Sequence, residues 1–246
     1  MQTKINLMPM HIKAEKGEVA DRVIAVEDRE TAEALSVFLQ NAKLVNRNRE
    51  LYVYTGMYRG SGVSIATHGI GAPSATLVFD ELSQLGVKLI IRLGTAKSLS
   101  KKVTKGDVVV SSGASYIPGG TIGEYVTESF FVLSAVPDLL VSQKLLEKLT
   151  GSGLRVFAGP TFSNDSYYSK YYDRDAGALA DKNFLCADME CASLLVLSSI
   201  RGFRSGCALM VTEDMEEKRG EGMSDKDLKK LIARVTPAVL DALVES

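Results

Sequence analysis

Clusters of polar side chains directly follow apolar runs in this 246-residue chain. They are residues 67–74, 92–95, 162–168, 188–192 and 211–214. If the runs are strands of an α/β sheet, the clusters lie at strand carboxyl ends, where such folds bind ligands. The first two clusters suit an anion and the last two carry carboxylates. The third combines aromatic rings with hydrogen-bonding groups, as a polar loop packed by aromatic side chains also does.

Arg92 is the strongest candidate for anion binding. It ends an apolar run, and a buried guanidinium needs an anionic partner, which is either an internal carboxylate or a bound ligand. Gly69 and Gly71 precede Pro73, a helix start whose unpaired N–H groups suit an anion. An ordinary strand-to-helix turn needs the same glycines, so both interpretations stay open.

Carboxylates gather in the last two clusters. Asp188 and Glu190 bracket Met189 in apolar surroundings, where they need protons, cations or sugar hydroxyls as partners. Alternatively, the helix dipole alone favours one of these acids at a helix N-terminus. Glu213 and Asp214 follow the 207–211 run and suit general acid or base catalysis, although adjacent acids also occur in solvated loops.

Composition excludes several classes of protein. Hydrophobic residues make up 46% and charged residues 24%, which excludes wholesale disorder, and the net charge of -1 gives no reason to expect nucleic acid or a membrane surface as a partner. No apolar run reaches the roughly 18 residues of a membrane span, and residues 1–11 lack the apolar block of a signal peptide, so we expect a cytoplasmic protein. Three cysteines and two distant histidines predict neither a disulfide framework nor a metal site.

Hydrophobic periodicity predicts alternating strands and helices. The expected strands are 22–26, 51–58, 63–67, 88–92, 107–110, 154–157 and 207–211. The expected helices are 28–39, 73–85, 137–149, 192–200 and 224–244, the last with a kink at Pro237. This alternation predicts one α/β domain over residues 1–246, with a mixed, largely parallel central sheet flanked by helices.

Several of these stretches, taken in order, resemble one family. The matching stretches are Asn48-Arg49, residues 64–71, Arg92-Leu93-Gly94-Thr95, residues 113–116, residues 162–165 and Met189-Glu190-Cys191-Ala192. Together they resemble the nucleoside phosphorylase family, which contains the hexameric purine nucleoside, methylthioadenosine and uridine phosphorylases. The likeness spans almost the whole chain and is greatest to the archaeal methylthioadenosine-type branch.

The resemblance implies a reaction and a set of site residues. Phosphate attacks one face of the sugar while the base leaves from the other, with no cofactor besides inorganic phosphate as co-substrate. The resemblance assigns Met189 and Glu190, next to Asp188, to the ribose of a small-molecule nucleoside, and Phe162 to the base. It assigns Arg92 and Thr95 to phosphate. His11 and Arg49 resemble residues lent by a neighbouring subunit, which implies a homo-oligomer with sites shared across a dimer interface.

Five positions depart from the family pattern, one of them Asp214, which replaces an asparagine beside Glu213. Glu27 replaces the glycine and Thr31 the arginine of the first phosphate loop, and Lys97 replaces a glycine after Thr95. We expect Lys97 to pair with Glu27 and fill the phosphate space. Glu213 replaces the aspartate that protonates the purine, which keeps the type of chemistry but moves the carboxyl.

Three functions remain open on the sequence. The first is phosphorolysis of a purine or methylthio-purine nucleoside, against which Glu27 and Thr31 count. The second is phosphate-independent hydrolysis, with Glu27 or Glu30 activating water. The third is a catalytically silent nucleoside-binding protein or oligomer subunit. The resemblance also disfavours uridine, because uridine phosphorylases read the pyrimidine with a glutamine and an arginine after the loop that matches residues 162–165, and no glutamine follows Gln143. Residues 216–222 are a candidate lid or a plain solvated loop.

Overall fold

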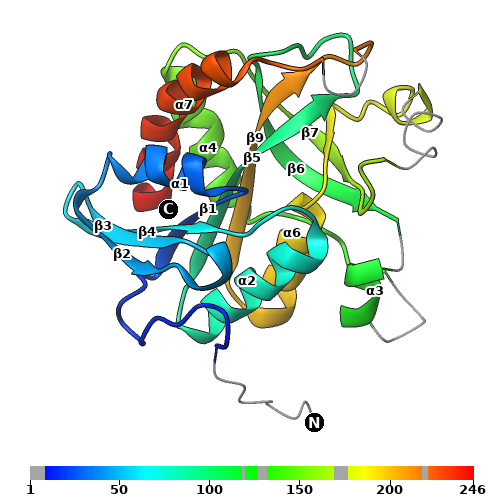
Figure 1. Cartoon of the computed structure of the whole chain (residues 1–246). Helices are drawn as coiled ribbons and strands as arrows, with labels where there is room; N and C mark the ends of the chain where they lie inside the picture. Colours follow the sequence, from blue (N-terminus) through cyan, green and yellow to red (C-terminus); the bar gives the residue numbers. More distant parts are fainter. Residues whose placement is uncertain (1–8, 118–119, 127–131, 169–176, 218–220) are drawn as a thin grey trace.

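The strands of the chain form one twisted, mixed sheet. In a computed structural model, the residues described are 9–117, 120–126, 132–168, 177–217 and 221–246 (Figure 1). Their strands are β1 (Arg22–Val26), β2 (Gln40–Asn46), β3 (Val53–Tyr58), β4 (Ser61–Thr67), β5 (Leu89–Ser98), β6 (Val108–Tyr116), β7 (Val156–Ser163), β8 (Cys186–Asp188) and β9 (Arg204–Glu213). They are hydrogen-bonded in the order β2-β3-β4-β1-β5-β8-β7-β6-β9. Because β5 also pairs with β9, the last five strands of this order close into a ring.

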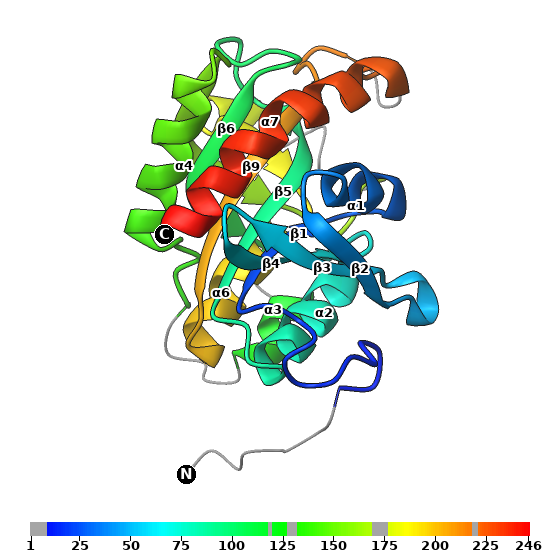
Figure 2. The same ribbon diagram turned by 90° about the vertical axis from the view of Figure 1, so that its left-hand side faces the viewer.

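Helices cover both faces of the sheet. They are α1 (Arg29–Ser36), α2 (Ala72–Gln84), α3 (Gly120–Tyr125), α4 (Leu139–Gly151), α6 (Cys191–Arg201) and α7 (Asp225–Glu245), with a short 3-10 turn η1 (Asn48–Glu50). Helices α1, α4 and α7 lie on one side and α2, α3 and α6 on the other (Figures 1 and 2). Each group packs its apolar side chains into its own buried cluster against the sheet. The predicted α/β domain with a mixed, largely parallel sheet is therefore confirmed.

Local sequence signals explain where three of the described helices begin. Asp28 caps α1 by accepting a hydrogen bond from the Thr31 N–H at 2.9 Å, Asp138 caps α4, and Ser224 caps α7. The predicted first helix ends early, at Ser36, and β2 begins at Gln40. Helix α7 runs through Pro237 as one element.

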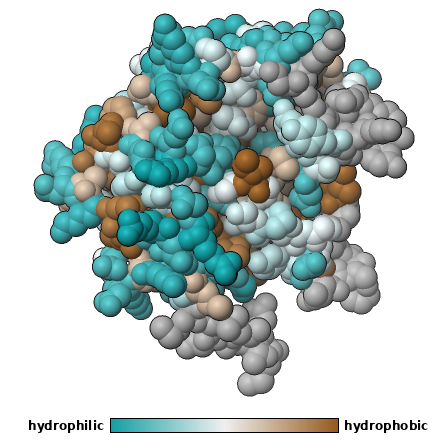
Figure 3. All heavy atoms as spheres, in the orientation of Figure 1, coloured by the Kyte–Doolittle hydropathy of each residue, from teal (hydrophilic) through white to brown (hydrophobic). Residues whose placement is uncertain are grey.

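The surface gives no sign of a large apolar interface on the face drawn in Figure 3. Hydrophilic side chains dominate there, and hydrophobic ones appear as small separate patches (Figure 3). Among the described residues, no helix is long and apolar enough to span a membrane.

Candidate functional site

A cavity of about 530 Å³ opens at one end of the sheet. Its lining comes from the ends of β1, β4, β5, β7, β8 and β9 and the loops that follow them, including Tyr167 and Tyr168, together with Leu228. All five polar clusters reach its lining, through Ile70, Thr95, Tyr167, Met189 and Glu213, as expected for side chains that follow neighbouring strands.

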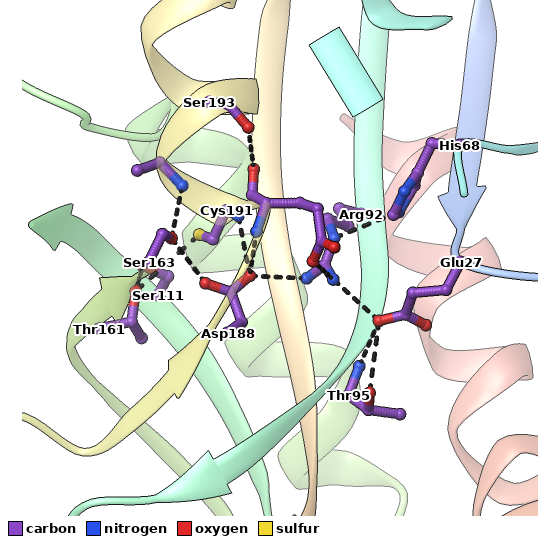
Figure 4. Close-up of polar contacts among 12 residues, drawn as sticks. Glu27, His68, Arg92, Thr95, Ser111, Thr161, Ser163, Asp188, Cys191 and Ser193 are labelled. Carbon is purple, nitrogen blue, oxygen red and sulfur yellow. Dashed lines mark hydrogen bonds and ion pairs between the residues drawn. The ribbon is translucent and has the colours of Figure 1, made fainter. Parts of the chain in front are cut away.

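Arg92 is the centre of a buried charged cluster behind this cavity (Figure 4). Its side chain is 0% exposed. Nη1 donates to Asp188 Oδ2 at 2.9 Å, and Nη2 donates to Glu27 Oε1 at 2.8 Å and Glu190 Oε2 at 2.5 Å. Burial opposes the charge of Arg92, but the three carboxylates outweigh it and raise the pKa of the guanidinium. Of the two partners left open by the sequence, the structure thus supplies internal carboxylates.

Two neighbours set the orientation of Arg92. Its Nε donates to His68 Nε2 at 3.2 Å, and burial followed by the Arg92 charge lowers the pKa of His68 well below its usual value, so this ring is neutral. Gly94 lies under the guanidinium, where any Cβ would collide with Arg92. The glycine two residues after the arginine is therefore what lets the side chain fold back along its own strand.

Glu27 accepts hydrogen bonds from Arg92 and Thr95, the two residues that the resemblance assigns to phosphate. Its Oε1 accepts from Arg92 Nη2 at 2.8 Å and from the Thr95 N–H, also at 2.8 Å, with the Thr95 hydroxyl at 3.4 Å. Burial raises the pKa of Glu27 above its usual value, and the Arg92 charge offsets this only in part. The side chain is 15% exposed and lines the cavity, so its carboxyl faces any ligand bound there.

Lys97 does not pair with Glu27, so that expectation is wrong. In the pairing of β5 with β9, a register shift between Ala96 and Lys97 places Lys97 opposite Glu213. The Lys97 ammonium lies 3.7 Å from Glu213 Oε2 and donates to the Glu217 carbonyl at 2.8 Å. The internal salt bridge at the predicted phosphate position is made by Arg92 instead.

Asp188 and Glu190 lie at the start of α6 and hydrogen-bond to different parts of the chain. Asp188 Oδ2 accepts from the Cys191 N–H at 2.8 Å, and Oδ1 accepts from the Ser163 hydroxyl at 2.6 Å, so Asp188 holds the helix end in place. Glu190 accepts from the Gly71 N–H at 2.5 Å, and burial raises its pKa to about 7. Both carboxylates and Met189 line the cavity.

Glu213 ends β9 at the other side of the cavity. Its Oε1 accepts from the Tyr167 hydroxyl at 2.9 Å. Asp214 turns away and accepts from the Lys105 N–H at 2.7 Å. Residues 218–220 of the candidate lid lie outside the described residues.

Besides Arg92, which lies behind the cavity, four of the predicted residues do not line it. Phe162 packs edge-to-face on Phe184, with ring centroids 6.4 Å apart. Tyr167, five residues later in the same cluster, lines the cavity instead. The aromatic residues in 162–168 are the sequence feature that could have indicated it. Thr31 donates to the Asp28 carboxylate.

His11 and Arg49 are the other two. His11 Nδ1 lies 2.7 Å from Glu81 Oε1, and Arg49 sits in η1 with a φ of 54°. Their assignment to a neighbouring subunit's site stays a prediction, as do the roles of the other site residues.

Sequence comparison decides the family. Residues 21–245 match the family model of the phosphorylase superfamily. The chain belongs to this superfamily. It is 30% identical to a DeoD-type purine nucleoside phosphorylase of Buchnera aphidicola, with 95% of this chain and 97% of the relative covered. It is 29% identical to a guanosine phosphorylase of Halorubrum lacusprofundi, with 88% of each chain covered.

Other similar proteins of the superfamily are named as uridine phosphorylases rather than purine nucleoside phosphorylases. It is 31% identical to a uridine phosphorylase of Thermococcus kodakarensis, with 83% of this chain and 76% of the relative covered. The crystal structure of a uridine phosphorylase from Vibrio fischeri shares the fold, with a TM-score of 0.86, 22% identity and 100% of both chains covered. The preference for purine and the likeness to the methylthioadenosine-type branch therefore stay predictions.

Proposed function

We propose that the cavity binds a purine nucleoside and that the protein acts on its N-glycosidic bond without phosphate. Membership of the phosphorylase superfamily supports nucleoside binding. Met189, Glu190 and Glu213 line this cavity. Following the family resemblance, we assign Met189 and Glu190 to the ribose and Glu213 to the acid that faces the base. Tyr167, which contacts Glu213, replaces Phe162 in our assignment of the ring beside the base.

The position of Glu27 is the main argument against phosphate binding. Its carboxylate takes the Arg92 and Thr95 donors, so a phosphate oxygen would have to displace it. If both anions stayed, their repulsion at about 4 Å would cost about 4 kcal/mol at an effective dielectric of about 20, or about a thousandfold in affinity.

Glu27 also supports water as the acceptor of the sugar. A buried carboxylate that lines the cavity can take a proton from water. Burial favours the protonated product of that step, because it raises the pKa of Glu27. Glu30 does not share this position: it is exposed and pairs with Lys229 at 3.1 Å.

One observation favours the silent alternative. Lys97 holds Glu213 in an ion pair, and an acid that is already paired donates a proton less readily to a leaving purine. In that case the chain binds a nucleoside without cleaving it.

Base release distinguishes these functions. Adenosine, inosine, guanosine and methylthioadenosine are each incubated with the full chain, with and without phosphate, and free base and sugar products are measured by chromatography. We expect free ribose and no dependence on phosphate. Glu27→Gln, which keeps the size of the side chain but cannot accept a proton as a carboxylate does, should slow release. Ribose 1-phosphate formed at a rate that rises with phosphate would refute the proposal, and binding without release would support the silent alternative.

We also infer a homo-oligomer in which His11 and Arg49 reach a neighbouring site. Light scattering after size-exclusion chromatography gives the mass. An Arg49→Ala variant that keeps this mass should bind nucleoside more weakly. A monomer that binds nucleoside fully would overturn this arrangement.

A further inference from the structure

The ionisable side chains that line the cavity are mostly acidic. Among the described lining residues, the acids are Glu27, Asp28, Asp188, Glu190 and Glu213, and the base is Lys97. Arg92 adds a second positive charge from behind, where three of these carboxylates cover it. Within the part of the chain that the structure describes, five carboxylates against two cations leave the lining negative, even with the raised pKa values of Glu27 and Glu190. Such a cavity repels anions and attracts cations.

Two aromatic rings add to this attraction. Tyr167 and Tyr168 both line the cavity, and their rings lie edge-to-face with centroids 5.0 Å apart. The face of an aromatic ring attracts a positive charge, and the attraction grows when the charge is removed from water. Carboxylates and tyrosines around one cavity are therefore a suitable environment for a flat, positively charged ring.

Glu213 offers a specific acceptor for that charge. Its Oε1 is held by Tyr167 at 2.9 Å. Its Oε2 is buried and accepts no hydrogen bond from the part of the chain that the structure describes, since Lys97 at 3.7 Å is too distant for one. Lys97 supplies charge but no hydrogen bond to this buried oxygen, so a ligand cation closer to it would add to the stabilisation.

We propose that the cavity prefers purine nucleosides whose base carries a fixed positive charge, such as N7-alkylated purine nucleosides, over neutral ones. This proposal rests on the nucleoside function proposed above. An N7-alkylated base needs no proton from Glu213 in order to leave, so the Lys97–Glu213 ion pair does not hinder it. In the cleavage step, the C1′–N9 bond breaks and its electron pair neutralises the ring. Water forms the new C1′–O bond and gives its proton to Glu27, which releases it to solvent.

Paired ligands isolate the effect of charge. Isothermal titration calorimetry with the full chain compares 7-methylguanosine with 7-deaza-7-methylguanosine, in mildly acidic buffer that keeps the first fully cationic. The two ligands have the same shape and differ in charge. A unit charge within about 5 Å of a carboxylate gains enough at an effective dielectric of about 20 that we expect at least about tenfold tighter binding of the cation.

Two variants connect the preference to the residues. Glu213→Gln keeps the shape of the side chain but loses its charge, and should reduce the preference for the cation several-fold. Lys97→Met removes the opposing cation and should increase it. The Lys97 variant also covers the case in which Glu213→Gln fails to fold.

The outcomes separate this inference from the function on which it rests. Equal affinity for the two ligands, or tighter binding of the neutral one, would overturn the charge preference and leave nucleoside binding intact. No binding of either ligand would overturn both. A preference unchanged in Glu213→Gln and Lys97→Met would overturn the role given to this pair.

Discussion

Replacing Glu27 by glycine should open an anion site. The change removes the carboxylate that accepts from Arg92 Nη2 and the Thr95 N–H, each at 2.8 Å, and so frees two donors that point at one place. Asp188 and Glu190 still hold Arg92, so the guanidinium should keep its position.

The expected magnitude follows from the charge removed. Repulsion between the Glu27 carboxylate and a phosphate about 4 Å away costs about 4 kcal/mol at an effective dielectric of about 20. Part of this is lost to the 15% exposure of the side chain, which lets solvent screen the charge. We therefore expect phosphate to bind the Glu27→Gly variant at least about a hundredfold more tightly than the unmodified chain.

Calorimetric titration with phosphate measures this directly, with chloride at matched ionic strength as the control. Glu27→Gln is the matched variant, since its amide oxygen can still accept from both donors but carries no charge; its affinity should lie between the other two. Equal phosphate affinity in all three proteins would refute the reasoning, because it would mean that Glu27 does not compete for the site.

Three further predictions concern stability. Arg92→Met leaves three buried carboxylates without their cation and should lower the free energy of unfolding by about 3–5 kcal/mol in urea denaturation. Burial raises the pKa of Glu190 to about 7, so the folded state binds a proton that the unfolded state releases; this stabilisation is complete below the ordinary pKa of 4.5 and is lost as the pH rises through 7. Glu190→Gln should flatten that decline, and an unchanged pH profile of stability would contradict the assignment. Asp138→Ala removes the cap of α4 and the hydrogen bonds from Arg204, and should cost about 2 kcal/mol without changing nucleoside affinity.

The sequence predicts the elements with strong hydrophobic periodicity and misses those without it. Strand 22–26 is found because residues 23–26 are an unbroken apolar run, and the capped helices because apolar residues recur at helical spacing after a start signal. Strand β2 (Gln40–Asn46) is missed because it lies at the sheet edge and exposes most of its side chains. Strand β8 is missed because three residues carry too little pattern.

At the site, the sequence identifies most of the charged residues but not all of their partners. It marks Glu27, Arg92 and Thr95 as parts of one anion position, and these three do meet. It pairs Lys97 with Glu27 wrongly, because the register shift in the β5–β9 pairing, which brings Lys97 to Glu213, depends on contacts between distant strands. The assignment of Phe162 rests on the family resemblance, whereas the course of the loop, which the sequence does not reveal, brings Tyr167 to the cavity and packs Phe162 on Phe184.

The absence of a side chain at Gly94 can serve as a marker in other sequences. No residue larger than glycine fits there while Arg92 folds back over its own strand, since a Cβ would meet the guanidinium. In a relative of this chain, a side chain at the Gly94 position would therefore indicate that the arginine two residues earlier points elsewhere. A glycine there would allow the arginine to point inward whatever residue stands at position 27. When new sequences are classified, the Arg92–Gly94 pair and the residue at position 27 can therefore be assessed separately.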